Sequence, residues 1–171
     1  PLATQAKLTA ATHWLWALTD PETGRVPNLG ANDGAHLFPL TNQVFHDYRP
    51  VVDAAAKAFL GKDVYQQPAL NEMAQWFQVE APAPEYPKQP QAPDMLRVEG
   101  ENGRAFIHTA HYKSRPSHAD QLHVDLWWRG VNLALDPGTY RYNAPPPWDN
   151  ALASARVHNT LTIDSQDQMT R

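Results

Sequence analysis

A proline-rich stretch divides the sequence into two parts with different hydrophobic patterns. Residues 79–93 contain five prolines: Pro82, Pro84, Pro87, Pro90 and Pro93. Because proline has no backbone N–H donor, this stretch disfavours both helix and sheet. Before this stretch apolar residues recur at helical spacing, and after it they alternate with polar residues as in strands. The pattern predicts an α+β chain with a helical part at 1–78, a linker at 79–93 and an antiparallel β part at 94–171.

Three amphipathic helices are expected in the first part. The apolar spacing predicts one from Lys7 to Leu18, a second that starts near Pro50 and ends at Gly61, and a third from Pro68 to Phe77. Asp47 is a candidate cap for the second helix. The third helix should place Leu70, Met73 and Phe77 on one face. Between the first two helices, a loop rich in Asn, Gly and Pro is a typical location for binding residues.

Two hairpins are expected in the second part. One turns at Glu101 to Gly103, and the other turns at Arg129-Gly130 and brings Asp136 back beside the strand that contains His123. Between Gln121 and Trp128 polar and apolar residues alternate, which predicts that one set faces a core and the other faces outward. On this interpretation Asp125 lies on a solvated strand face.

Composition narrows the classes of function. A net charge of −4 gives no electrostatic case for nucleic-acid binding, and no apolar run approaches the ~18 residues that a membrane span needs. With no cysteine, any metal ion must be held by His, Asp or Glu. Because the sequence ends just after a strand-like alternation, the β part is expected to continue beyond it.

Histidines and aspartates gather between Arg115 and Asn159. The segment contains His118, Asp120, His123, Asp125, Asp136 and His158. Imidazole nitrogens and carboxylate oxygens are the ligands of a divalent metal such as zinc. A simple hairpin register favours His123 as the partner of Asp136.

Four motifs resemble the heparinase II/III family of polysaccharide lyases: PNLGANDGAHLFPL, HADQLHVDL, DPGTY and VHNT. The resemblance implies part of an (α/α) toroid followed by part of a β-sandwich, with an acidic, uronate-containing polysaccharide in the cleft between them. It also implies zinc ligands at His118, Asp136 and His158, with Asp120 in support. A bend at Ser117-His118 would bring His118 into the site in place of His123. A periplasmic or extracellular location is implied, as is packing of the rest of the parent chain on both parts.

One position departs from the family pattern. The family carries a catalytic histidine two residues before His118, and this sequence has Pro116 there. His111 and His123 are the available substitutes, and His123 is the one expected in the catalytic set. Tyr48 is the candidate match for the family's catalytic tyrosine on the toroid.

Lysis beside a uronate needs a base for the C5 proton and a group that neutralises the sugar carboxylate. Tyr140 and Asn32 are the candidates for these two roles. Asn28, Asp33 and Trp148 are expected to bind substrate.

Two other functions remain open on the sequence. The segment could bind carbohydrate without turnover around a metal that supports folding, as the missing histidine would allow. Metal-dependent hydrolysis would need an open coordination position and a general base, and no Glu stands near the ligands in the sequence.

Overall fold

The structure is a computed structural model that describes residues 2–30, 38–81, 87–114, 116–141 and 143–168. The chain separates into two compact units. One comprises Pro1–Val26 with His36–Ala92, and the other comprises Pro27–Ala35 with Pro93–Arg171. The short segment around Asn28 therefore packs with the C-terminal unit, although it precedes the second helix in sequence. Asn32 and Asp33 lie outside the described residues.

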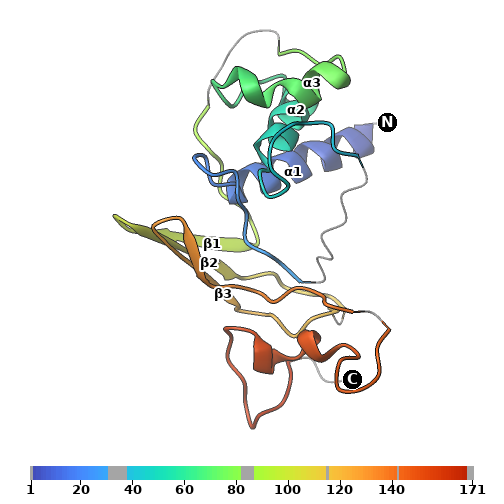
Figure 1. The fold of residues 1–171 in the computed structure, drawn as a ribbon, viewed down its shortest axis with the longest axis vertical. Coiled ribbons are helices and arrows are strands. Elements are labelled where there is room, and N and C mark those ends of the chain that lie inside the picture. The colour runs from blue at the N-terminus through green and yellow to red at the C-terminus, as the bar shows by residue number, and fades with distance from the viewer. Residues whose placement is uncertain (1, 31–37, 82–86, 115, 142, 169–171) are drawn as a thin grey trace. The chain divides into compact units, whose positions relative to one another are not determined.

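Two helices build the core of the first unit (Figure 1). Helix α2 spans Arg49–Leu60, close to the predicted range, and helix α1 spans Leu2–Leu18, so α1 ends where predicted but begins before Lys7. Their core consists of Trp16, Val52, Ala56 and Val64. Gly61 ends α2 in the left-handed conformation, which glycine adopts without steric cost. Among the described residues no helix is long and apolar enough to cross a membrane.

The third predicted helix is shorter than expected. It consists of the 3₁₀ turn η1 (Pro68–Leu70) followed by α3 (Glu72–Trp76). Leu70 and Met73 are buried as predicted, but Phe77 is 60% exposed, so the single apolar face expected for the three residues was wrong. The physical reason is that α3 ends at Trp76 and the chain then turns through a positive φ of 53° at Gln78.

The start of α2 also differs in detail from the expectation. Tyr48 is the residue at the N-cap position, and no side-chain cap is formed there. Asp47 instead accepts a hydrogen bond from the backbone N–H of Arg49 at 3.0 Å and pairs with the Arg49 guanidinium at 2.6 Å. Asp47 therefore still satisfies one of the N–H groups that a helix start leaves free.

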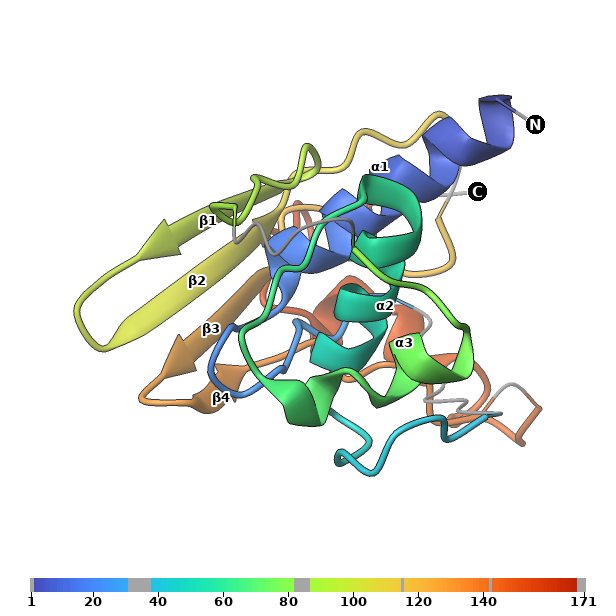
Figure 2. The ribbon, with the colours of Figure 1, turned by 90° about the horizontal axis from the view of Figure 1, so that it is seen from above.

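The second unit contains a four-stranded antiparallel sheet in the order β1-β2-β3-β4 (Figure 2). The strands are β1 (Met95–Glu99), β2 (Gly103–His108), β3 (Val124–Trp128) and β4 (Val131–Ala134). Both predicted hairpins are present. Arg129 and Gly130 form the second turn with φ of 48° and 76°, the left-handed pair that a two-residue hairpin requires.

The two faces of β3 are the reverse of the simple expectation. Asp125 and Trp127 are buried, with 1% and 5% of their surface exposed, whereas Trp128 is 47% exposed. Asp125 accepts hydrogen bonds from the Trp127 indole N–H and the Asn132 side chain, which satisfies a carboxylate that alternation alone would place in solvent. The apolar set forms an exposed sheet face: Leu96, Val98, Leu126, Trp128, Val131 and Leu133.

Candidate metal centre

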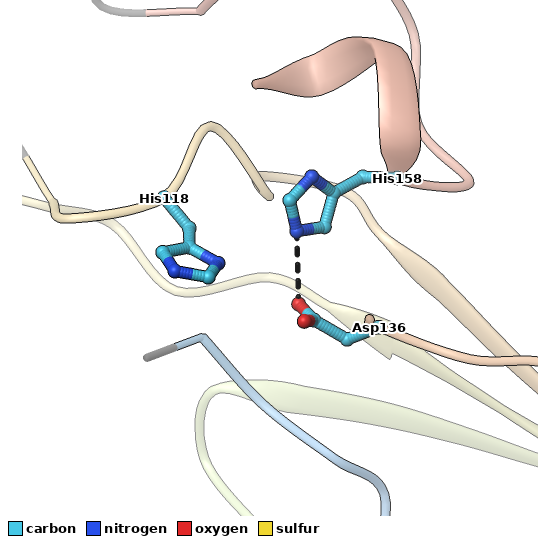
Figure 3. Close-up of side chains that lie close together, drawn as sticks. All are labelled: His118, Asp136 and His158. Carbon is cyan, nitrogen blue, oxygen red and sulfur yellow. Dashed lines mark ion pairs between the residues drawn. The ribbon is translucent and has the colours of Figure 1, made fainter. Parts of the chain in front are cut away.

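Three buried side chains from separate loops converge at one end of the sheet (Figure 3). His118 lies in the loop before β3, Asp136 lies two residues beyond β4, and His158 follows the 3₁₀ turn η3 (Ala155–Val157). One potential ligand atom of each residue lies within 4.8 Å of the other two. The exposed fractions are 5%, 1% and 8%, so bulk water does not screen these groups.

The backbone carbonyl of Ser154 orients the His158 ring. Its Nδ1 lies 2.8 Å from the carbonyl oxygen of Ser154, which can only accept, so Nδ1 carries the proton. In the neutral ring Nε2 then has a lone pair, and it faces Oδ2 of Asp136 at 3.1 Å (Figure 3). Two lone pairs at this distance need a cation between them, which is either a proton on His158 or a metal ion.

The pKa values of this pair follow from the same contact. Burial opposes the charged ring of His158, but the bonds to Asp136 and Ser154 outweigh it and raise the pKa of His158 above its ordinary value. Burial likewise opposes the carboxylate of Asp136, but His158 and the backbone N–H of Gly138 outweigh it and lower the pKa of Asp136. The pair thus holds an ionised carboxylate ready for a cation.

Backbone groups fix the Asp136 carboxylate. Its Oδ1 accepts the Gly138 N–H at 2.7 Å, and its Oδ2 lies 3.3 Å from the N–H of Gly30. The side-chain amide of Asn28 donates to the backbone carbonyl of Asp136 at 3.0 Å. Metal-binding carboxylates are commonly oriented by such outer hydrogen bonds.

His118 completes the group as a neutral imidazole. Burial lowers its pKa, although the charge of Asp136 acts in the opposite direction. Its Nε2 lies 3.4 Å from the Thr139 hydroxyl, and its buried Nδ1 has no hydrogen-bond partner among the described residues. A buried ring nitrogen without a partner is costly unless a cation uses it, so the three residues fit a divalent metal ion. Two imidazoles and a carboxylate do not by themselves select one metal.

The histidine that lies with Asp136 and His158 is His118, the residue that the family pattern implies, and not His123. The chain bends at Ser117 and His118, and the β3–β4 register shifts between Leu126 and Trp127. The simple hairpin register, which favoured His123, assumed neither irregularity. His123 lies beside the group, with its ring centroid 5.6 Å from that of His158.

His123 and Asp120 form a buried layer next to the group. His123 is 1% exposed, and its Nδ1 accepts the backbone N–H of Asn159, the residue after His158. Burial lowers the pKa of His123. Asp120 is 3% exposed, lies 3.7 Å from Nδ1 of His108 and acts on the histidines through its charge. We therefore propose that Asp120 supports the metal group through its negative charge rather than through a direct bond to a ligand.

Two further predicted residues line a pocket that includes His118. Tyr140 and Trp148 meet edge to face in this pocket, with ring centroids 6.4 Å apart. Sequence reasoning missed Arg141, whose guanidinium carbon lies 5.0 Å from the centre of the Tyr140 ring. A basic residue directly after an aromatic one in DPGTYR was the available signal. It also missed Ser154, because a backbone carbonyl leaves no trace in side-chain identity.

Comparisons with known proteins add a family match. Residues 95–171 match the family "Heparinase II/III-like, C-terminal". No curated protein matches the sequence. Two solved structures are similar at 18% identity: heparan sulfate lyase HepC from Pedobacter heparinus, with a TM-score of 0.48, and a mutant of it, with 0.47. Each similarity covers 90% of this chain and 23% of the other, so the chain spans less than a quarter of those proteins.

Proposed function

Because residues 95–171 match the heparinase II/III-like C-terminal family, we propose that the chain is part of a lyase that cleaves a uronate-containing polysaccharide by β-elimination. The observation that carries the proposal is the buried His118, Asp136 and His158 group, which shares His118 with the pocket that contains Tyr140. A lyase needs such a phenol beside a site that admits an acidic sugar.

The proposed chemistry assigns separate tasks to the chain's residues. Tyr140, which is 64% exposed, is proposed to take the C5 proton or to protonate the leaving oxygen. Asn32 is proposed to stabilise the charge that develops on the sugar carboxylate, and Asp33 and Trp148 to hold the sugar. Asn28 bonds to the backbone at Asp136, which supports a structural contribution to the same site.

The metal is proposed to be zinc, with a supporting role. When bound, it would neutralise the Asp136 carboxylate and link the three chain segments that carry His118, Asp136 and His158. His123 is proposed to assist by holding the segment of His158 through the Asn159 N–H, and its 1% exposure favours this role over contact with substrate. Pro116 stands where the family has its catalytic histidine. Because His123 is buried, we propose that another residue, one that the substrate can reach, takes over the role of that histidine.

The larger architecture follows from the same premise. We propose the family's arrangement, with 1–78 as part of an (α/α) toroid, 79–93 as a linker and 94–171 as part of a β-sandwich. The exposed apolar face of β1–β4 supports the last point, because a second sheet normally covers such a face. The remainder of the parent protein is proposed to supply that cover.

Product analysis tests the proposed activity. The protein that carries this segment is incubated with sulfated and unsulfated uronate polysaccharides, and ultraviolet absorbance follows the unsaturated sugar end that only elimination creates. A rise in absorbance with at least one polymer is expected. New reducing ends without absorbance would identify a hydrolase instead.

Pro116 favours a second candidate function. With proline in place of the family's catalytic histidine, the segment would bind an acidic polysaccharide around a folding metal without turnover. Binding of polymer with neither absorbance nor new reducing ends would establish this alternative.

A further inference from the structure

A second pocket lies wholly within the helical unit, beside the C-terminal end of α2. Its volume is about 760 Å³, and small-molecule sites typically occupy ~300–1,000 Å³. Lys57, which lines the pocket, lies in the last turn of α2, whereas Tyr48 is the residue at the N-cap of that helix. The pocket shares no residue with the metal group, because His118, Asp136 and His158 belong to the other unit.

Side-chain amides are the commonest polar groups in the lining of this pocket. An amide offers two N–H donors and a carbonyl acceptor, so it pairs with a group that both donates and accepts, as a hydroxyl does. The apolar part of the wall includes Tyr65, Pro68 and Val79. Apolar walls with several amides suit a ligand that carries many hydroxyls on a carbon frame. The amides belong to Gln66, Gln67, Asn71, Gln75 and Gln78.

The charge of the lining is unfavourable for an anion. The charged side chains among the described lining residues are Lys57, Asp63 and Glu80. The Nζ of Lys57 donates to Asp53 and, at 2.9 Å, to the side-chain oxygen of Asn71, and it lies 3.4 Å from Asp63. The positive charge is therefore already matched by carboxylates of the same unit. An uncharged ligand fits this lining better than a uronate or a sulfate does.

Gln78 adopts a backbone conformation that glycine adopts more readily. Its φ of 53° lies in the left-handed region, and its backbone N–H donates to the carbonyl of Gln75 at 3.0 Å where α3 ends. Glycine is the usual residue at such a helix end, because a side chain is strained there. Residues held in this conformation cluster at functional sites, and the side chain of Gln78 lines the pocket. The strain therefore points to a use for the amide.

Two exposed aromatic rings stand between the lining residues Gln75 and Gln78 in sequence. Trp76 is 67% exposed and Phe77 is 60% exposed, although large aromatic side chains are more often buried. The C–H face of a sugar can pack against such a ring while its hydroxyls reach polar groups. The residues next to the pocket thus supply the apolar contact that its amides lack.

We propose that this pocket binds one uncharged sugar unit, with the amides of Gln75 and Gln78 bonded to its hydroxyls and Trp76 packed against its ring. The inference goes beyond the proposed lyase function, because the pocket contains no residue assigned to elimination and its ligand carries no uronate. It is a binding site only, and no bond is made or broken in it.

Isothermal titration calorimetry of the protein that carries this segment tests the site without turnover. The uncharged probes are cellobiose, maltose and lactose, and the charged probe is a disaccharide that contains glucuronate. At least one uncharged probe should bind with a Kd on the order of 1 mM or tighter. The charged probe reports on the proposed lyase site, so its affinity should not respond to substitutions in this pocket.

Gln78→Gly removes the amide but permits the left-handed turn. It should weaken binding of the uncharged probe by about three- to tenfold, since one hydrogen bond contributes a free energy of that size. The Tm should stay unchanged or rise, because glycine adopts this conformation without steric cost. A fall in Tm with unchanged affinity would show that Gln78 is purely structural and would contradict the proposal.

Gln75→Ala should likewise weaken the uncharged probe. The matched control is Gln5→Ala, since Gln5 is an exposed glutamine on α1 and does not line the pocket. Equal affinities in Gln75→Ala and Gln5→Ala, or no measurable binding of any uncharged probe by the unsubstituted protein, would overturn the site. Binding as expected without product in the absorbance assay would overturn only the lyase activity.

Discussion

The side-chain amide of Asn28 donates a hydrogen bond to the backbone carbonyl of Asp136 at 3.0 Å, across 108 positions of sequence. Two residues later, the backbone N–H of Gly30 lies 3.3 Å from the carboxylate of the same aspartate. A segment that precedes the second helix is thus attached to a candidate metal ligand that follows the last strand. Metal affinity and the position of this segment should therefore depend on each other.

We expect Asn28→Ala to weaken metal binding by about tenfold, because loss of an outer hydrogen bond typically costs ~10–100-fold in affinity. Zinc titration of chelator-treated protein measures the effect. The control is Asn42→Ala, which removes a comparable side-chain bond, to Glu72 at 3.1 Å in the helical unit. Equal affinities in the two variants would mean that Asn28 does not orient Asp136.

Removal of a proposed ligand should abolish tight metal binding. His158→Ala and His118→Ala should bind zinc at least ~100-fold more weakly than the unsubstituted chain. At a metal concentration of 100 times Kd, bound metal stabilises the folded chain by ~2.7 kcal/mol and therefore raises its Tm. The two variants should lose most of this rise in Tm. The exposed His111 provides the control as His111→Ala. Metal analysis that finds full occupancy in His158→Ala would contradict the assignment.

Asp125 should make stability depend on pH. Burial raises its pKa from 3.8 to about 6, although bonds from Asn132 and Trp127 act in the opposite direction. The folded state therefore holds the proton more tightly than the unfolded state, and the free energy of unfolding should fall as pH rises from about 4 to about 6. Asp125→Asn keeps the size of the side chain and should remove this pH dependence. Above pH 6 the free energy of unfolding of the variant should exceed that of the unsubstituted chain by on the order of 2 kcal/mol.

Urea unfolding at several pH values measures this effect. The exposed Asp149→Asn serves as the control and should leave the pH profile unchanged. A profile of Asp125→Asn that parallels the unsubstituted chain would show that Asp125 does not titrate in this range.

Two substitutions address the proposed elimination. Tyr140→Phe removes only a hydroxyl from an exposed ring, so it should leave Tm unchanged and reduce turnover by roughly a hundredfold or more if that hydroxyl transfers a proton. Asn32→Ala should likewise reduce turnover more than stability. Absorbance assays paired with thermal unfolding report both quantities, and unchanged turnover in both variants would remove these residues from the mechanism.

Local rules were sufficient for much of the fold. Pro50 and Gly61 mark the two ends of α2, and Arg129-Gly130 marks a hairpin turn, because each residue type restricts or permits backbone angles whatever surrounds it. Family resemblance added His118, Asp136 and His158 before their geometry was known. The sequence contained no equivalent signal for the contact between Asn28 and Asp136.

The sequence by itself determined the order of elements and the set of possible ligands, since periodicity and residue chemistry are local properties. The tertiary structure decided which face of β3 is buried, because Asn132 and the Trp127 indole reach Asp125 from positions that alternation does not encode. It also decided that His118 rather than His123 joins Asp136, through a bend and a register shift. Such choices depend on hydrogen bonds between residues far apart in sequence, which form only when the chain has folded.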